Sequence, residues 1–204
     1  MRGRFISFEG GEGSGNSTQA RLIVEDLLRR GERVVLTREP GGTEGAEAVR
    51  ALLVTGDAER WSPWAEVCLV NEARADHVDR VIRPALERGE WVICDRFVDS
   101  TRAYQGAGKG IDDAALCALH RAVAGNLWPD ATVVLNVSSQ LGLHRAASRR
   151  DAESRFESHD VEFHRRVGEF FARLPDAEPR RCHGFEADQP VAELARAIAA
   201  LVMR

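Results

Sequence analysis

A glycine-rich stretch near the start of the chain has the residue types and spacing of a phosphate-binding loop. Its residues are Gly10, Gly11, Glu12, Gly13, Ser14, Gly15, Asn16, Ser17 and Thr18. Glycines allow backbone N–H groups to converge on a phosphate, and the N-terminus of a following helix adds partial positive charge. The pattern G-x-x-x-x-G-K-[ST] fits Gly10, Gly15 and Ser17, but Asn16 stands at the position of the lysine. We therefore predict a P-loop that binds phosphate without its usual cation.

Charged side chains follow two other apolar runs of the chain. Asp95 and Arg96 follow one run, and Arg38 and Glu39 follow another. An acid at a strand end beside a P-loop acts on the magnesium sphere, and arginine offers phosphate a planar donor fork. Glu39 could accept hydrogen bonds from sugar hydroxyls or from water near a metal. A surface ion pair at Asp95 and Arg96, and an ordinary turn after Glu39, remain the alternatives.

Arginines gather in a third region, near residue 150. They are Arg145, Arg149, Arg150 and Arg155, with acidic residues between them. A mixed-charge stretch of this kind is typical of a solvated helix face with i, i+4 ion pairs. Arginines on a mobile segment could equally close over a triphosphate and neutralise the charge that is transferred. The residues by themselves leave both interpretations open.

The hydrophobic pattern predicts an α/β scaffold with a parallel sheet for these candidate residues. Apolar runs alternate with helical periodicity along the chain. The predicted strands are 5–8, 33–37, 91–94, 131–137 and 181–185. The predicted helices are 18–30, 44–53, 65–88, 112–124, 141–149, 161–174 and 191–203. In such folds ligands gather at the carboxyl ends of the strands, which is where the loop and both charged pairs fall.

Composition narrows the class of protein. A chain of 204 residues suits one domain with a substantial core. Its net charge of −4 gives no general support for nucleic-acid binding. No apolar stretch has the length of a membrane span or of a signal-peptide core, and the four cysteines form no C-x-x-C pair. We therefore expect a cytoplasmic protein that binds neither nucleic acid nor membrane.

Four motifs, in this order, resemble those of the bacterial thymidylate kinases, a family of P-loop nucleoside monophosphate kinases. They are Phe-Glu-Gly-Gly-Glu-Gly at 8–13, Thr-Arg-Glu-Pro-Gly-Gly-Thr at 37–43, Ala-Arg at 73–74 and Asp-Arg-Phe-Val-Asp-Ser-Thr-Arg-Ala-Tyr-Gln-Gly at 95–106. The last is the most specific, and the resemblance runs nearly end to end. It implies a P-loop NTPase fold in a single domain, 1–204. The implied sheet has five parallel strands in the order 2-3-1-4-5, with helices on both faces and a short arginine-rich lid at about 145–158.

The resemblance also implies a reaction, the transfer of the γ-phosphoryl group of ATP to dTMP, with Mg²⁺ and in a homodimer. The residues that it places around ATP are Gly10, Gly11, Glu12, Gly13, Ser14, Gly15, Asn16, Ser17, Thr18 and Arg149. Those that it places around dTMP are Glu12, Arg38, Glu39, Arg50, Val70, Arg74, Arg96, Thr101, Tyr104 and Gln105. Ser17 and Asp95 are the implied magnesium residues. The implied catalytic positions are Asn16, Arg96, Arg150 and Arg155.

Three residues depart from the resemblance. Asparagine at position 16 can donate a hydrogen bond but is short and neutral, and the loss of one preorganised donor costs about 10²–10³ in rate. Val70 replaces a phenylalanine that stacks on thymine, which should weaken base binding by about 1–3 kcal/mol. Glu72 stands where a small residue is usual.

These departures leave alternatives to a working dTMP kinase open. One is a non-catalytic nucleotide-binding homologue, kept for regulation or dimer assembly. Another is a nucleoside monophosphate kinase with a different base preference. In a third, Asn16 is an engineered substitution that traps a complex.

Overall fold

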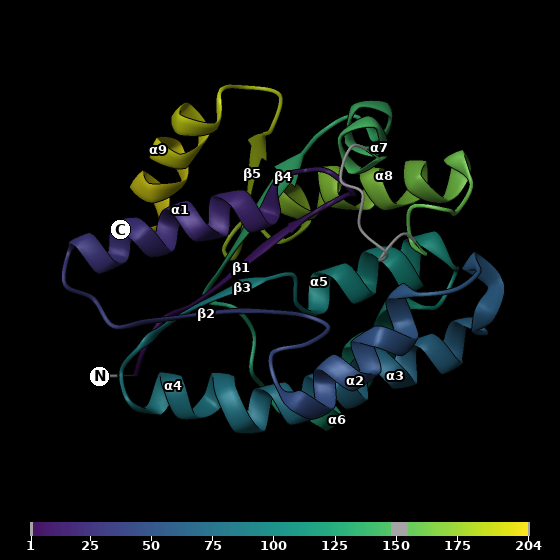
Figure 1. Cartoon of the computed structure of the whole chain (residues 1–204), viewed down its shortest axis with the longest axis horizontal. Coiled ribbons are helices and arrows are strands. Elements are labelled where there is room, and N and C mark those ends of the chain that lie inside the picture. The colour runs from purple at the N-terminus through teal and green to yellow at the C-terminus, as the bar shows by residue number, and fades with distance from the viewer. Residues whose placement is uncertain (1, 148–154, 204) are drawn as a thin grey trace.

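Five parallel strands form the centre of the structure, a computed structural model that describes residues 2–147 and 155–203 (Figure 1). The strands are β1 (Phe5–Gly10), β2 (Val34–Arg38), β3 (Trp91–Asp95), β4 (Ala131–Asn136) and β5 (Cys182–Glu186). They are hydrogen-bonded in the order β2-β3-β1-β4-β5. The predicted sheet and its strand order are thereby confirmed.

The register of the sheet sets the carboxyl ends of the inner strands side by side. Phe8 of β1 and Arg38 of β2 both align with Asp95 of β3. Gly10 of β1 aligns with Leu135 of β4. The glycine loop that follows β1 therefore lies between the segment that follows β3 and the segment that follows β4.

Helices and short helical turns connect the strands. They are α1 (Asn16–Arg29), α2 (Glu44–Val54), η1 (Ala58–Arg60), α3 (Pro63–His77), η2 (Val78–Ile82), α4 (Arg83–Glu87), α5 (Val98–Thr101), η3 (Arg102–Gly108), α6 (Asp113–Ala124), α7 (Ser139–Ala147), α8 (Val161–Ala177) and α9 (Val191–Val202). η1 is a 3₁₀ turn, and η2 and η3 are π-helical. None of the helices in the described ranges is long and apolar enough to cross a membrane.

Two stretches differ from the predicted helices. The predicted helix 65–88 consists of α3, η2 and α4 in succession, with Pro84 in the first turn of α4, where proline is tolerated. The segment after Asp95, for which no helix was predicted, forms α5 and η3. Its buried positions include Asp99, Arg102 and Gln105, so it lacks the apolar periodicity by which a core-facing helix is recognised.

Helices cover both faces of the sheet. On one face α1 and α9 lie together, and Ile23 and Ile198 pack in one cluster with Ile6 and Phe8 of β1 (Figure 1). On the other face Phe5 packs in a cluster with residues of η2, α4 and α6. Successive side chains of a strand point to opposite faces, so β1 contributes to both clusters. α8 covers the same face as α6 beside β4 and β5.

Candidate active site

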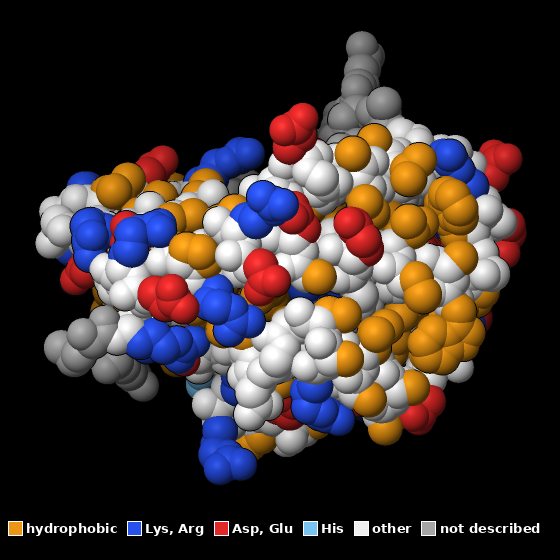
Figure 2. Space-filling view, turned by 90° about the horizontal axis from the view of Figure 1, so that it is seen from below, with side chains coloured by type: hydrophobic (Ala, Val, Ile, Leu, Met, Phe, Trp, Pro, Cys, Tyr) orange, Lys and Arg blue, Asp and Glu red, His pale blue; other side chains and the backbone are white. Residues whose placement is uncertain are grey.

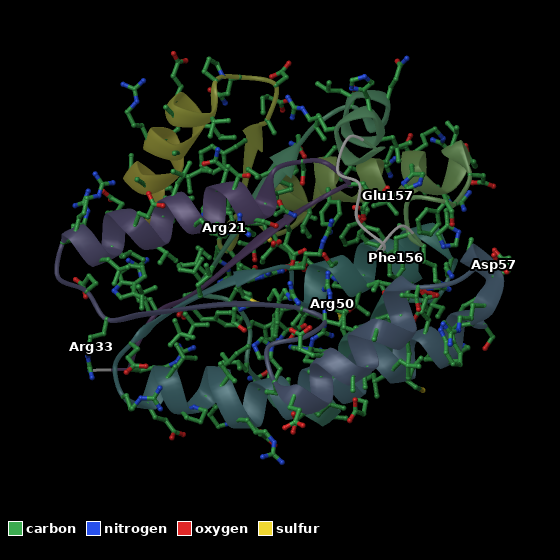
Figure 3. All side chains as sticks on the ribbon, in the orientation of Figure 1. Arg21, Arg33, Arg50, Asp57, Phe156 and Glu157 are labelled. Atoms are coloured by element: carbon green, nitrogen blue, oxygen red, sulfur yellow. The ribbon has the colours of Figure 1, made fainter. Side chains whose placement is uncertain are left out.

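A cleft of about 720 Å³ opens at the carboxyl edge of the sheet. The glycine loop and the ends of β2 and β3 line one part of it, and α3, α5 and η3 line another. Figure 3 shows Arg50 of α2 together with Phe156 and Glu157, which all line this cleft. The fold thus brings segments from most of the chain to one cavity.

The glycine loop has the backbone that its sequence predicts. Gly13 and Gly15 have φ values of +67° and +98°, which residues with side chains rarely adopt. A Cβ on Gly13 would lie only 2.0 Å from the carbonyl oxygen of Gly142 in α7. Asn16 then begins α1, and residues 11–19 all line the cleft. Loop and helix N-terminus together suit an anion such as phosphate.

Asn16 is buried inside the loop, with 5% of its surface exposed. Its Oδ1 accepts a hydrogen bond from Ser14 Oγ at 3.2 Å. Its Nδ2 has no hydrogen-bond partner among the described residues. Because a buried donor without a partner costs free energy, this amide suits a ligand oxygen in the loop. The position of the lysine therefore offers one neutral donor.

Ser17 and Asp95 meet at the edge of the loop. The Ser17 hydroxyl donates to Asp95 Oδ2, and both residues line the cleft. A hydroxyl and a carboxylate, completed by phosphate oxygens and water, are the ligands that Mg²⁺ takes in nucleotide-dependent enzymes. The two side chains fit the predicted magnesium site.

Arg96 connects the loop to the opposite wall of the cleft. Its Nη1 donates to the carbonyl oxygen of Gly10 at 2.8 Å and to Ser100 Oγ at 3.2 Å. Its Nη2 lies 3.5 Å from Glu12 Oε1, and its guanidinium carbon lies 5.1 Å from the ring centroid of Tyr104. Burial alone would lower the pKa of Arg96, but Tyr104 and the nearby carboxylates raise it. Arg96 is therefore a fixed positive charge beside the loop.

Glu9 holds the turn that carries Arg96. Arg96 has a φ of +69°, which is uncommon for a residue with a side chain. The Phe97 N–H donates to Glu9 Oε1 at 2.7 Å, and Ser100 Oγ donates to Glu9 Oε2 at 2.5 Å. The sequence analysis did not single out Glu9, which lies in a strand whose six residues are all buried.

Burial, followed by the neighbouring Asp99 carboxylate, raises the pKa of Glu9 from 4.5 to about 8. Between these pH values the folded state holds one proton more than the unfolded state, so stability falls as pH rises. We expect Glu9 to lower the free energy of unfolding by roughly 1.4 kcal/mol per pH unit in this window. Urea unfolding should show a smaller loss of stability with pH for Glu9→Gln, which cannot ionise. Glu25→Gln, at an exposed position, is the control, and equal slopes for all three chains would refute the expectation.

Arg74 lies buried in the wall formed by α3. Its Nε donates to Glu39 Oε2 at 2.8 Å and its Nη2 donates to Thr101 Oγ1 at 2.9 Å. His77 Nδ1 lies 3.1 Å from the other oxygen of Glu39. Burial would raise the pKa of Glu39, but Arg74 and His77 outweigh burial and lower it. Arg74 is thus held in place where it lines the cleft.

The structure brings all ten residues implied around dTMP to this one cleft. They are Glu12, Arg38, Glu39, Arg50, Val70, Arg74, Arg96, Thr101, Tyr104 and Gln105. Gly10 is not among the lining residues, and its carbonyl oxygen holds Arg96. Glu72 is exposed and is likewise absent from the lining of the cleft.

Half of the predicted lid, residues 148–154, lies outside the described ranges. Arg149 and Arg150 are among those residues. Arg145, at the start of the predicted lid, lines the cleft, and its Nη1 donates to the carbonyl oxygen of Ala187 at 3.0 Å.

The structure does not bring Arg155 to the cleft, contrary to the catalytic position implied for it. Its side chain is fully buried and pairs with Glu66, with Nη1 3.2 Å from Oε1. Its guanidinium also donates to the carbonyl oxygens of Leu53, Asp57 and Ala58. A buried charge requires such partners, and here they occupy all three nitrogens. Arg155 therefore fixes the turn that follows it and does not face a phosphate.

A sheet of this order, with a glycine loop after its central strand and a cleft at that edge, defines a P-loop nucleotide-binding protein. Comparison with known proteins specifies the family. The family model described as thymidylate kinase matches residues 8–198. The chain therefore belongs to the thymidylate kinase family and is an enzyme of the nucleoside monophosphate kinase class.

Individual relatives match the whole chain or nearly all of it. The thymidylate kinase of Caulobacter vibrioides is 47% identical over 203 residues, which span 100% of this chain and 97% of the relative. That of Nitrobacter winogradskyi is 48% identical and spans 98% of this chain and 89% of the relative. The crystal structure of thymidylate kinase from Ehrlichia chaffeensis superposes with a TM-score of 0.82 at 33% identity, with full coverage of both chains.

Proposed function

We propose that this chain transfers the γ-phosphoryl group of ATP to dTMP, giving dTDP and ADP, as one domain that spans 1–204. One observation carries the proposal: the glycine loop and the arginines of the opposite wall line a single cleft. Phosphoryl transfer requires donor and acceptor phosphates to meet in a positively charged site that excludes water. Relatives that match nearly the whole chain carry the name thymidylate kinase.

The phosphate-binding groups of the chain lie on both sides of the reacting centre. Backbone N–H groups of the loop and the N-terminus of α1 bind the phosphates of ATP. Arg96 is held by Gly10 and Ser100 and directs its charge to the acceptor phosphate. Ser17 and Asp95 would hold Mg²⁺, which would neutralise phosphate charge when bound.

The cleft offers the nucleobase of dTMP a side chain that can form hydrogen bonds with the edge of its ring. Gln105 Nε2 donates to Glu66 Oε1 at 3.3 Å. Because a carboxylate only accepts hydrogen bonds, the amide oxygen of Gln105 faces away from Glu66. An acceptor in the base pocket favours thymine, whose ring carries an N–H between two carbonyls, over cytosine, whose ring nitrogen there is an acceptor.

The choice of acceptor tests this proposal. We expect ADP release with ATP and Mg²⁺ to depend on dTMP, and dCMP and dGMP to be poor substitutes. A coupled assay measures the rate of ADP release with dTMP, dUMP, dCMP and dGMP at equal concentrations, and a reaction without acceptor is the control. A clear preference for another nucleotide would assign a different base specificity. If ATP binds but no acceptor is turned over, the chain is a non-catalytic nucleotide-binding protein.

We also propose that the chain works as a homodimer. Figure 2 shows hydrophobic side chains gathered at one end of the face that carries α2 and α3. Large exposed hydrophobic residues of these helices include Leu52 and Trp64, which are 40% and 51% exposed. Sedimentation velocity should give twice the mass of the chain, and a monomer at every concentration would refute the dimer.

A further inference from the structure

The base side of the cleft combines a valine on a helix with an aromatic ring from a distant segment. Val70 lies one turn before Arg74 on α3 and lines the cleft with an aliphatic side chain. Phe156 lines the same cleft and packs against the cluster of Leu53, Val54 and Val70. The wall therefore contains an aromatic ring, but α3 does not supply it.

The Phe156 ring is held in place from two sides. The guanidinium carbon of Arg155 lies 5.3 Å from the ring centroid, and Arg155 is itself fixed by Glu66 and by backbone carbonyl oxygens. Tyr104 meets the ring edge to face, with the centroids 5.6 Å apart. The ring is thus positioned at the wall of the cleft before any ligand enters.

Groups that can form hydrogen bonds lie next to this ring. Glu66, which fixes Arg155, also accepts a hydrogen bond from Gln105 Nε2, so one carboxylate positions both the ring-bearing turn and the amide. Gln105 follows Tyr104, whose ring contacts Phe156. A flat apolar ring beside donors and acceptors is the arrangement that recognises a nucleobase, by its face and by its edge.

We propose that Phe156 supplies the surface on which the acceptor nucleobase stacks, at the wall where α3 offers Val70 and no aromatic ring. The inference rests on the proposed function, since the base is that of the acceptor nucleotide. The loss of base affinity expected from Val70 is then offset by a ring from the turn after residue 154.

Calorimetric titration of dTMP tests the role of the ring. Phe156→Leu keeps an apolar side chain but removes the stacking surface, and we expect it to weaken dTMP binding by about tenfold or more. ATP binding should stay within about twofold, because the ring contacts the acceptor only. Phe170→Leu is the matched control, because Phe170 is a partly buried ring of α8 that does not line the cleft. An unchanged dTMP affinity for Phe156→Leu would overturn the proposal.

Two further variants distinguish stacking from a structural role. In Phe156→Trp, dTMP should quench the added tryptophan emission, measured as the difference from the unaltered chain, and no quenching would count against stacking. Val70→Phe should restore dTMP affinity when combined with Phe156→Leu. By itself it should give no gain, because Phe156 already packs there. If the unaltered chain binds ATP but not dTMP, the proposed function fails and this inference with it. If dTMP binds and these variants leave its affinity unchanged, only the inference fails.

Discussion

Replacing Asn16 with lysine is expected to raise kcat for dTMP phosphorylation by about 10²-fold or more. Asn16 begins α1 inside the loop, and its neutral Nδ2 is the only polar hydrogen-bond donor of its side chain. Lysine carries a charge on a stem long enough to follow the phosphoryl group as negative charge shifts during transfer. A hundredfold gain corresponds to about 2.7 kcal/mol of transition-state stabilisation. Steady-state kinetics with ATP and dTMP measures it.

The accompanying variants separate charge from size. Asn16→Met is long but uncharged and should give no gain, while Asn16→Ala removes the Nδ2 donor and should lower kcat further. The KM for ATP should change much less than kcat, since backbone N–H groups and the helix N-terminus supply most of the phosphate binding. A kcat for Asn16→Lys no higher than that of the unaltered chain would show that the loop does not lack a cation.

Replacing Arg96 with methionine is expected to lower kcat/KM for dTMP by about 10²–10³-fold. The variant removes a charge that Gly10 and Ser100 hold beside the loop and that contributes most when phosphates meet in the transition state. The kcat/KM of Arg96→Lys should lie between those of the unaltered chain and Arg96→Met, because lysine keeps the charge but lacks the planar donor fork of arginine. Initial rates at several dTMP concentrations give the ratio.

An exposed arginine provides the control for this prediction. Arg29 lies in the last turn of α1 with 74% of its side chain exposed, and Arg29→Met should leave kcat/KM unchanged. If Arg96→Met kept the activity of the unaltered chain, the acceptor phosphate would have to bind elsewhere.

Most of the scaffold could be predicted from the sequence because it depends on local patterns. Strands are short apolar runs, and α1 follows directly from the glycine loop. The resemblance to the thymidylate kinases implied the strand order that places Asp95 next to β1. The α5–η3 segment was not predicted to be helical because several of its buried positions, among them Asp99, Arg102 and Gln105, are polar. Asp99 pairs there with Arg181, 82 residues further along the chain, and no periodicity reports a contact of that kind.

The site was predictable where a residue acts directly and unpredictable where it acts through its surroundings. Arg96 and Arg74 stand in motifs, but the burial of Arg155 against Glu66 depends on how α3 packs beside a turn 89 residues away. The same packing brings Phe156 to Val70, so the cost of a valine there could not be judged from one position. Glu9 was not predicted as a site residue because its role depends on the backbone of the turn that follows another strand, β3.

The most direct test of the central claim is the identity of the product. The unaltered chain, incubated with ATP, Mg²⁺ and dTMP, should form dTDP and ADP in equal amounts, resolved and quantified by ion-exchange chromatography. Reactions without dTMP should form neither product. The contradictory result is ATP binding by the unaltered chain without dTDP formation. Product formed by Asn16→Lys alone would then assign the loss of activity to residue 16.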